Sequence, residues 1–399
     1  MKKILSLYLL FIGSLLTSYA QTTVRSLEEA LNMALEQNAG LQALALQGEQ
    51  QLQLQKTASE LSKAMIFHSY DENNISPNGR ALRVFGIRQD FPFPTVWSGR
   101  KKLYRLNTSL AQQEYQIGNW NLRREVAQAY YGVLYHQNRL RELSYLDSLY
   151  ANFQRAADRR YSVGETGYLE KITATNYYQR IHLQRLQEEE ALRTAQSKLR
   201  GHLQSEYPVD VAYAPLTQVV APDSAATAPG ITYYELNQQR AEASLRLQRQ
   251  RLWPDISLEY FRGFGYGENA QNFDGYAVGL SIPLWFVPFH HRVQAEKFQV
   301  AQVQQETQQY TRIWTSQRNQ LLATLNQYDQ AVRYLEESGL PAAEEMQEVA
   351  QKSYQAGEIS YLNYIQILES ATQSQLDYLE NLNDYNQTYW ELYYLTNFP

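Results

Sequence analysis

The sequence predicts a mainly α-helical protein in which one long unit occurs twice and four β-strands form part of a membrane barrel shared between copies. Three observations support this fold class: a repeated phrase, helical stretches far longer than a compact domain needs, and two pairs of alternating strands. The phrase is YSVGETGYL at 161–169 and YQAGEISYL at 354–362. The two copies of the phrase begin 193 residues apart (354 − 161), and Gly86 and Gly279, each in a predicted strand, are also 193 residues apart (279 − 86). Two landmarks at one spacing indicate an internal duplication.

A secretory signal is predicted at residues 1–20. Two lysines precede an apolar stretch at 4–16, and small residues at Ser18 and Ala20 favour cleavage before Gln21. We therefore expect the mature protein to leave the cytoplasm. Because the chain has no Cys, an N-terminal lipid anchor on Cys, disulfides, thiolate metal sites and Cys catalysis are excluded.

Composition narrows the function classes further. The 36 basic and 41 acidic residues are mixed along the chain, which does not resemble a nucleic-acid-binding surface. No apolar run of about 18 residues follows the signal, so no transmembrane helix is predicted. The 32 tyrosines cover apolar surface while keeping a polar tip, which suits a wet surface or a membrane interface.

The first repeat, 21–203, follows the order helix, hairpin, very long helix, turn, helix. Ser26 and Glu29 form a capping box that starts the first helix. Pro92 ends the hairpin because Pro cannot continue a strand ladder, and Gly118 is a candidate break in the long helix. The predicted elements are a helix at 26–62, a hairpin at 64–91 with strands at 64–70 and 81–91, a helix at 98–161, a turn at 162–167 and a helix at 168–203.

A linker at 204–230 separates the repeats, because Pro, Ala, Val and Ser dominate there and helical periodicity disappears. The second repeat, 231–399, follows the plan of the first. Its strands alternate apolar and polar residues at period two. The predicted elements are a helix at 233–252, a hairpin at 255–285 with strands at 255–264 and 276–285, and helices at 291–339, 341–355 and 361–394.

The helices are long enough to build a tube rather than a compact core. A stretch of about 48 residues would measure roughly 72 Å. The last helix carries a narrow seam at coiled-coil spacing: Leu362, Ile365, Leu368, Ala371, Leu376, Leu379, Leu382, Tyr385 and Tyr389. Its other faces are polar, as expected where helices line a water-filled space.

The strands imply an oligomer. Their alternation fits a sheet with one lipid face and one aqueous face. Every backbone N–H and C=O in lipid needs an internal partner, so such a sheet must close on itself. About eight strands make the smallest usual membrane barrel, and the four predicted here are too few. Several copies must therefore share one barrel, with cyclic symmetry as the natural solution.

With these features the chain resembles the TolC-like outer-membrane efflux proteins, the outer-membrane channels of tripartite efflux pumps. The likeness includes the opening at 26–43, both hairpins, both glycine-centred turns and the duplication. That family's turn pattern, Tyr-x-x-Gly-x-x-Ser/Thr-x-x-Asp, occurs twice with departures. Gly167 stands at the Ser/Thr position of the first copy, and Asn363 replaces the acid of the second. The matching residues are Tyr161, Gly164, Gly167 and Glu170, then Tyr354, Gly357, Ser360 and Asn363.

The resemblance implies a homotrimer with a twelve-stranded β-barrel on a long, tandem-duplicated coiled-coil α-barrel. It implies an outer-membrane location in a Gram-negative bacterium, with the helices extending into the periplasm. It also implies passive export through a channel that works with a periplasmic adaptor and a proton-driven inner-membrane transporter. The exported substrate is left open between metal ions, drugs and secreted proteins.

The turns are expected to gate the channel and dock the adaptor. Rings of carboxylates at Glu165, Glu170 and Glu358 could tune a constriction; alternatively these acids only favour helix starts. Tyr168 and Tyr361 could contact the adaptor or pack within their own chain. The full set is Tyr161, Gly164, Glu165, Gly167, Tyr168, Glu170, Tyr354, Gly357, Glu358, Ser360, Tyr361 and Asn363.

A second set is expected at the membrane interface, because aromatic residues followed by basic ones border each hairpin. A plain aromatic core is the competing interpretation. The set is Trp97, Arg100, Lys101, Trp285, Phe286, His290 and Arg292.

No catalytic constellation, nucleotide motif or cofactor site is recognised, so the protein is not expected to be an enzyme. His290 and His291 are adjacent, and adjacent residues rarely converge on a metal. The main alternative is a periplasmic coiled-coil adaptor or scaffold without a pore, which would explain the helices but not the two hairpins. An outer-membrane enzyme is a remote third possibility.

Overall fold

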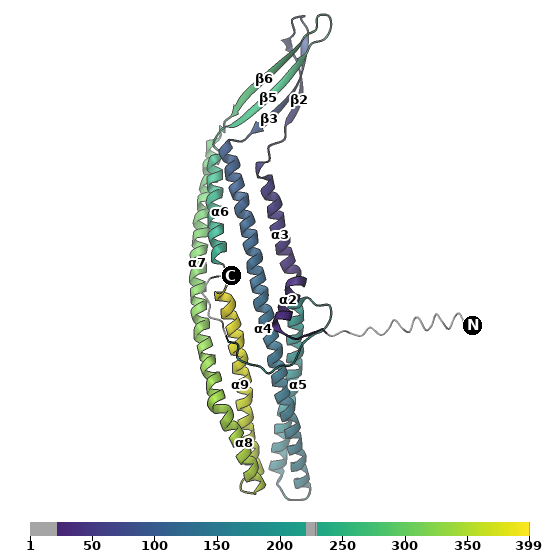
Figure 1. The fold of residues 1–399 in the computed structure, drawn as a ribbon, viewed down its shortest axis with the longest axis vertical. Coiled ribbons are helices and arrows are strands. Elements are labelled where there is room, and N and C mark those ends of the chain that lie inside the picture. The colour runs from purple at the N-terminus through teal and green to yellow at the C-terminus, as the bar shows by residue number, and fades with distance from the viewer. Residues whose placement is uncertain (1–21, 221–227, 229, 399) are drawn as a thin grey trace, which may run out of the picture. The chain divides into compact units, whose positions relative to one another are not determined.

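The computed structural model describes residues 22–220, 228 and 230–398, so the predicted signal peptide lies outside it. The described chain is mainly helical, with two small groups of strands (Figure 1). None of its helices is both long and apolar enough to cross a membrane. The elements are β1 (Thr22–Val24), α2 (Leu27–Gln37), α3 (Ala39–Lys56), the short η1 (Thr57–Ser59), β2 (Met65–Ile75), β3 (Ala81–Phe91), α4 (Pro94–Ser162), α5 (Tyr168–Leu203), β4 (Val209–Val211), α6 (Ile231–Gln250), β5 (Asp255–Phe264), β6 (Asn272–Ser281), α7 (Phe286–Tyr334), the π-helical turn η2 (Leu335–Gly339), α8 (Leu340–Gln355) and α9 (Tyr361–Thr396).

The chain divides into two compact units, and each unit takes segments from both repeats. The first unit contains the chain up to Leu41, the part from Gly118 into the linker, and the part from Trp314 onward. The second contains Gln42–Ile117 and Gly230–Ile313, including the four-stranded sheet. Since α4 and α7 contribute to both units, the sequence repeats are not the compact units of the fold.

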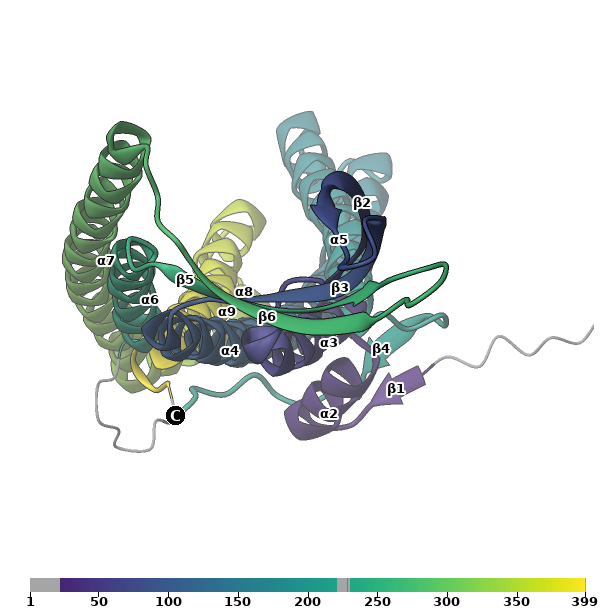
Figure 2. The same ribbon diagram turned by 90° about the horizontal axis from the view of Figure 1, so that it is seen from above.

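In the second unit both predicted hairpins join one antiparallel sheet of order β2-β3-β5-β6. The contact between hairpins runs along β3 and β5, and these strands curve together with β6 (Figure 2). One face of the sheet carries a row of apolar and tyrosine side chains that are paired directly across the four strands: Ile66, Ile87, Tyr260 and Tyr276. Ile66 is 78% exposed and Tyr276 is 84% exposed. Within one chain, this face therefore leaves a band of apolar side chains uncovered.

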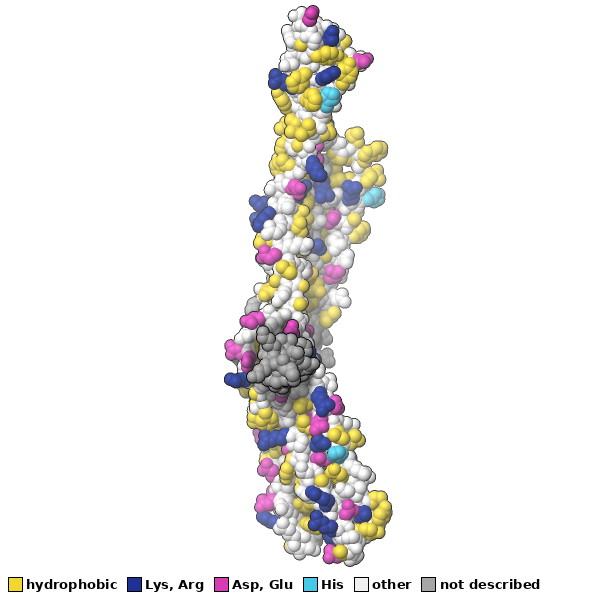
Figure 3. Space-filling view, turned by 90° about the vertical axis from the view of Figure 1, so that its right-hand side faces the viewer, with side chains coloured by type: hydrophobic (Ala, Val, Ile, Leu, Met, Phe, Trp, Pro, Cys, Tyr) yellow, Lys and Arg dark blue, Asp and Glu magenta, His cyan; other side chains and the backbone are white. Residues whose placement is uncertain are grey.

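The opposite face of the sheet mixes glycines, polar side chains and the rings of Phe67 and Phe261. Arg88 and Glu259 form an ion pair there across β3 and β5. The Phe67 ring lies over Gly86, where an added Cβ would stand 2.3 Å from it, so a larger residue there would displace the ring. In Figure 3, hydrophobic side chains gather over the strands at the upper end of the view. The alternation predicted from the sequence therefore places the row of exposed Ile and Tyr side chains on one face, which also carries the Arg262–Asp274 ion pair.

Several element ends differ from the predictions, and each difference has a local cause. The predicted helix at 26–62 is interrupted at Asn38, which is extended (ψ 111°) and whose side chain accepts a hydrogen bond from Leu41 N. The strand predicted at 276–285 is β6, displaced toward the loop because Asn272 already pairs with Phe264. The predicted break at Gly118 is wrong, since α4 continues through it.

The core of the first unit lies between α4, α5 and α9. Leu143, Leu146 and Tyr150 of α4 are almost fully buried against residues of α9 that include Ile365 and Leu368. This confirms the coiled-coil seam predicted for the last helix, because Ala371, Leu376 and Leu382 are buried as well.

The linker also contains structure that its composition did not indicate. Val209–Val211 forms β4, a parallel partner of β1. Further along, the Asn386 side chain of α9 accepts a hydrogen bond from Val219 N (3.0 Å) and donates one to Thr217 O (2.9 Å). The linker is thus attached to the first unit by backbone pairing and by a side-chain amide.

Candidate functional site: the paired helix turns

The two repeated phrases form the same turn. Gly164 and Gly357 both have φ of +77°, in the left-handed region that favours glycine. The residue after each glycine donates its N–H to a carbonyl five residues earlier: Glu165 to Arg160 and Glu358 to Ser353, each at 2.9 Å. These bonds close the C-terminal ends of α4 and α8. The motif therefore specifies a helix end that reverses the chain.

Gly357→Val should strain this turn without filling any occupied space. An added Cβ at Gly357 meets no atom within 4 Å, so the cost is the left-handed backbone, about 1–2 kcal/mol. We expect export in cells to fall more than thermal stability does. Gly201→Val is the matched control, because Gly201 also has open space around it but lacks a positive φ. Unchanged resistance in cells carrying Gly357→Val would contradict the role of this turn.

Arg160 connects the two turns, and sequence reasoning did not identify it. Its guanidinium lies 2.7 Å from Glu170 Oε1 and 3.8 Å from Glu165 Oε2 in the first turn. It also donates to the Tyr354 hydroxyl at 3.5 Å and lies 6.0 Å from the centre of the Tyr361 ring. The only signal in the sequence was a cation directly before the first phrase.

Each oxygen of the Glu170 carboxylate has a partner. Besides the ion pair with Arg160, its Oε2 accepts a 2.5 Å hydrogen bond from the Thr166 hydroxyl. Its side chain is 20% exposed, whereas that of Glu165 is 64% exposed. The two acids of the first turn therefore differ, with Glu170 fixed and Glu165 largely in solvent.

The tyrosines of the two turns have opposite environments. Tyr361 is 4% exposed and donates its hydroxyl to Phe153 O at 2.6 Å. Burial is the main cause that raises the pKa of Tyr361, and the nearby Tyr354 raises it further. Tyr168, its equivalent, is 60% exposed, and its ring contacts Tyr161 edge-on at 5.9 Å. Leu169 beside it is also exposed. The tyrosine of the first turn thus lies at an exposed apolar surface, whereas that of the second turn is part of the core.

The other residues predicted at the turns have simpler places. Gly167 precedes α5 without a side-chain cap, whereas the Ser360 hydroxyl caps α9 by accepting a hydrogen bond from Asn363 N at 3.2 Å. The Tyr354 ring stacks on Tyr364 with centroids 5.0 Å apart. The side chains of Glu358 and Asn363 are exposed.

The residues predicted at the membrane interface all lie in the second unit. Trp97 and Lys101 belong to the first turns of α4, and Arg100 donates to Glu60 O at 3.1 Å. Trp285 directly precedes α7 and is 83% exposed. The remaining members, Phe286, His290 and Arg292, are exposed at the start of α7. Among the described residues no group of three or more His, Asp or Glu side chains could hold a metal ion.

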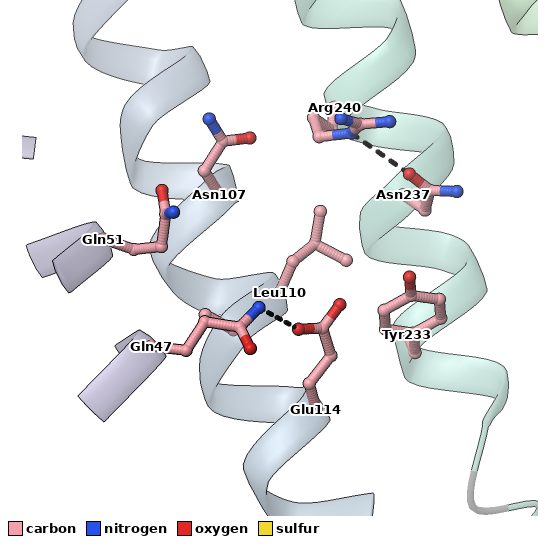
Figure 4. Close-up of a pocket in the computed structure, with 9 residues that line it drawn as sticks. Gln47, Gln51, Asn107, Leu110, Glu114, Tyr233, Asn237 and Arg240 are labelled. Carbon is pink, nitrogen blue, oxygen red and sulfur yellow. Dashed lines mark hydrogen bonds between the residues drawn. The ribbon is translucent and has the colours of Figure 1, made fainter. Parts of the chain in front are cut away.

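A polar cavity of about 360 Å³ in the second unit was not predicted. Figure 4 shows side chains from α3, α4 and α6 around it. Gln47 donates to Glu114 at 2.7 Å, and Arg240 donates to Asn237 at 3.1 Å. Burial raises the pKa of Tyr233, with a further rise from the nearby Glu114. The cavity is lined by four amide side chains together with Glu114, Tyr233 and Arg240.

Comparisons with known proteins agree with this architecture. The family described as "Outer membrane efflux protein" matches residues 221–397. The cobalt-zinc-cadmium resistance protein CzcC of Cupriavidus metallidurans is 21% identical over 383 residues, which are 91% of this chain and 87% of CzcC. The crystal structure of CusC is similar with a TM-score of 0.78 at 16% identity, covering 96% of both chains. The outer membrane protein VceC of Vibrio cholerae gives 0.77 at 12% identity, covering 94% of this chain and 97% of VceC.

Proposed function

We propose that the chain belongs to the outer membrane efflux protein family, whose description matches residues 221–397, and that it is the exit duct of a tripartite efflux system. It is located in the outer membrane and extends into the periplasm. Small molecules or ions would pass through it to the exterior without energy supplied by this protein. The family is one of channels rather than enzymes, and we assign the chain no catalytic role.

The observation that carries this proposal is the sheet with two free edges and an uncovered band of apolar side chains on one face. β2 and β6 each pair on one side only in the described chain. Unpaired backbone groups cannot remain in hydrocarbon, so each edge needs a partner strand. Copies of the same sheet supply that partner if β6 of one chain pairs with β2 of the next. Three copies would give a closed barrel of twelve strands, within the range of known membrane barrels.

The partner proteins follow from the same assignment. We propose that a periplasmic adaptor docks at the first turn, where Tyr161, Tyr168 and Leu169 are exposed. The second turn, with Tyr361 buried, would act as the support against which the first turn is held. An inner-membrane transporter, driven by protons, would deliver the substrate. Each repeat, 21–203 and 231–399, would thus contribute one hairpin to the barrel and one turn to the periplasmic end.

Planar bilayers test the proposal directly. Purified protein added to a lipid bilayer should give discrete conductance steps, and cross-linking in detergent should stop at the trimer. Cobalt, zinc, cadmium and organic cations would be compared as permeating ions, since CzcC is named for resistance to the three metals. A pore-free periplasmic scaffold predicts the opposite: no conductance, and release of the protein from cells without detergent. That result would overturn the duct assignment.

A further inference from the structure

One face of the four-stranded sheet changes from apolar to basic along its length. Alternate residues of a strand share a face, and this face carries Phe91, Ile87 and Arg83 in order along β3. On the neighbouring β5 it carries Ile256 and then Arg262, in the same direction along the sheet. The arginines lie toward the loops that join β2 to β3 and β5 to β6, whereas Phe91 lies next to the start of α4 (Figure 1). In Figure 3, basic side chains stand among hydrophobic ones at the upper end of the view.

The apolar part of this face is about as long as the span of a membrane barrel. From Phe91 to Arg83, β3 rises about 27 Å along the strand at 3.4 Å per residue. Membrane barrels present an apolar band about 25 Å tall between two interfacial girdles of aromatic residues. At the end of the sheet nearest the helices, Trp285 is 83% exposed directly before α7. Arg83 therefore stands where lipid headgroups begin on the side of the membrane away from the helices.

Two arginines converge on one aromatic ring at this loop end of the sheet. The guanidinium carbon of Arg80 lies 5.4 Å from the centre of the Tyr266 ring, and that of Arg83 lies 5.3 Å from the same point. Both distances allow a cation–π interaction. The ring therefore holds two like charges close together, and their mutual repulsion is relieved when an anion lies close to both.

Neither of these guanidiniums is neutralised by a carboxylate of the described chain. Arg262, on the same face, lies 3.6 Å from Asp274 and has its counter-charge within the sheet. Arg80 and Arg83 form no such ion pair among the described residues, and both are exposed. These two arginines can therefore pair with an anion supplied from outside the chain, which Arg262 could do only by giving up Asp274.

The two loops that carry these side chains are fastened to each other. The Asn78 amide donates hydrogen bonds to Tyr266 O and to Glu268 O, each at 3.1 Å. Arg80 N donates to the Asn78 side-chain oxygen at 3.2 Å, which fixes the backbone of Arg80 in the same contact. Gly267 has a φ of +87°, and an added Cβ there would stand 3.0 Å from Arg80 Nε. The loops therefore leave room for the Arg80 side chain and hold it beside the Tyr266 ring before any ligand binds.

We propose that Arg80 and Arg83, positioned by Tyr266, bind the phosphate of a lipid headgroup in the outer leaflet, with the acyl chains of that lipid on the apolar band next to them. Guanidinium is the side-chain group that pairs with two oxygens of one phosphate at once. The basic rim and the apolar band form one continuous surface of the same strands, which a lipid covers and a free phosphate ion does not. The proposal rests on the barrel assignment, because it requires this face to meet lipid.

Titrations of the full-length protein in detergent, followed by native mass spectrometry, test the site with three probes: lipid A with its two phosphates, the same lipid with both phosphates removed, and inorganic phosphate. The unmodified protein should bind the phosphorylated lipid roughly tenfold more tightly than the dephosphorylated one. In Arg80→Gln with Arg83→Gln, this preference should fall below about twofold. Arg80→Lys with Arg83→Lys should give an intermediate preference, because lysine keeps the charge but lacks the planar fork that pairs with two oxygens.

Two further double variants separate a local site from general charge. Lys297→Gln with Arg312→Gln is the matched control, because it removes the same charge from exposed positions of α7 in the second unit. It should keep the tenfold preference. Glu72→Gln with Glu268→Gln removes two exposed acids near the arginines and should tighten binding of the phosphorylated lipid by roughly two- to fivefold.

Conductance and cross-linking of the same samples distinguish this site from the duct itself. Arg80→Gln with Arg83→Gln should still form trimers and give conductance steps, since both residues are exposed. The lipid site is overturned if affinity does not depend on the phosphates of the lipid, if the arginine variant keeps the preference, or if the Lys297 and Arg312 variant loses it equally. It is also overturned if inorganic phosphate binds as tightly as the phosphorylated lipid. Absence of trimers and conductance in the unmodified protein would count against the duct instead.

Discussion

Arg160→Glu should raise the fraction of open channels in planar bilayers by roughly 5–30-fold, the range that corresponds to about 1–2 kcal/mol. The substitution replaces the guanidinium that contacts Glu170 and Glu165 with a third negative charge. It also removes the hydrogen bond to the Tyr354 hydroxyl, which is the polar contact of Arg160 with the second turn. Repulsion within the first turn and loss of this link both favour separation of the turns. The expected change in the open fraction is moderate because solvent screens the charge of the Arg160 side chain, which is 35% exposed.

Arg155→Glu provides the control for charge alone. Arg155 lies on the same helix, is exposed, and donates to Asn152 of its own helix. It should leave the open fraction within about twofold of the unmodified protein, as expected for a solvent-exposed charge. If Arg160→Glu and Arg155→Glu give the same conductance, Arg160 does not hold the periplasmic end closed.

Asn386→Ala should lower the free energy of unfolding by about 1–3 kcal/mol, because it removes both hydrogen bonds that the buried Asn386 side chain makes to the backbone of the linker. Asn386 is 0% exposed, accepts from Val219 N and donates to Thr217 O. Alanine can make neither hydrogen bond. Denaturant unfolding in detergent would measure the loss. Proteases should also cleave more rapidly near Thr217, since the linker is released from α9.

Asn381→Ala separates this effect from the general cost of an asparagine substitution in α9. The Asn381 amide donates to Asp377 O within its own helix and is partly exposed. We expect a change below about 0.5 kcal/mol. Asn386→Asp should cost at least as much as alanine, because it places a buried carboxylate against the Thr217 carbonyl oxygen. A loss below about 0.5 kcal/mol for Asn386→Ala would show that the linker is not fastened by this side chain.

Hydrophobic periodicity was sufficient to locate the strands and long helices, because it records which face of each element is buried. β3 and β5 begin and end where predicted, and the seam of α9 is buried as its spacing indicated. The pairing of β3 with β5 was not visible, since residues some 170 positions apart leave no mark on local periodicity. The strand β4 was missed for a different reason, because three residues are too few to show a period of two.

The two helix turns show most clearly which features the sequence determined and which only the tertiary structure decided. Sequence alone determined that both phrases end a helix at a left-handed glycine, because the bonds that define such a turn join residues at most five positions apart. Only the tertiary structure decided that Tyr361 is buried, that Tyr168 is exposed, and that Arg160 reaches Tyr354 in the other repeat. Those outcomes depend on which helices pack against each turn, and identical local sequences can acquire different neighbours.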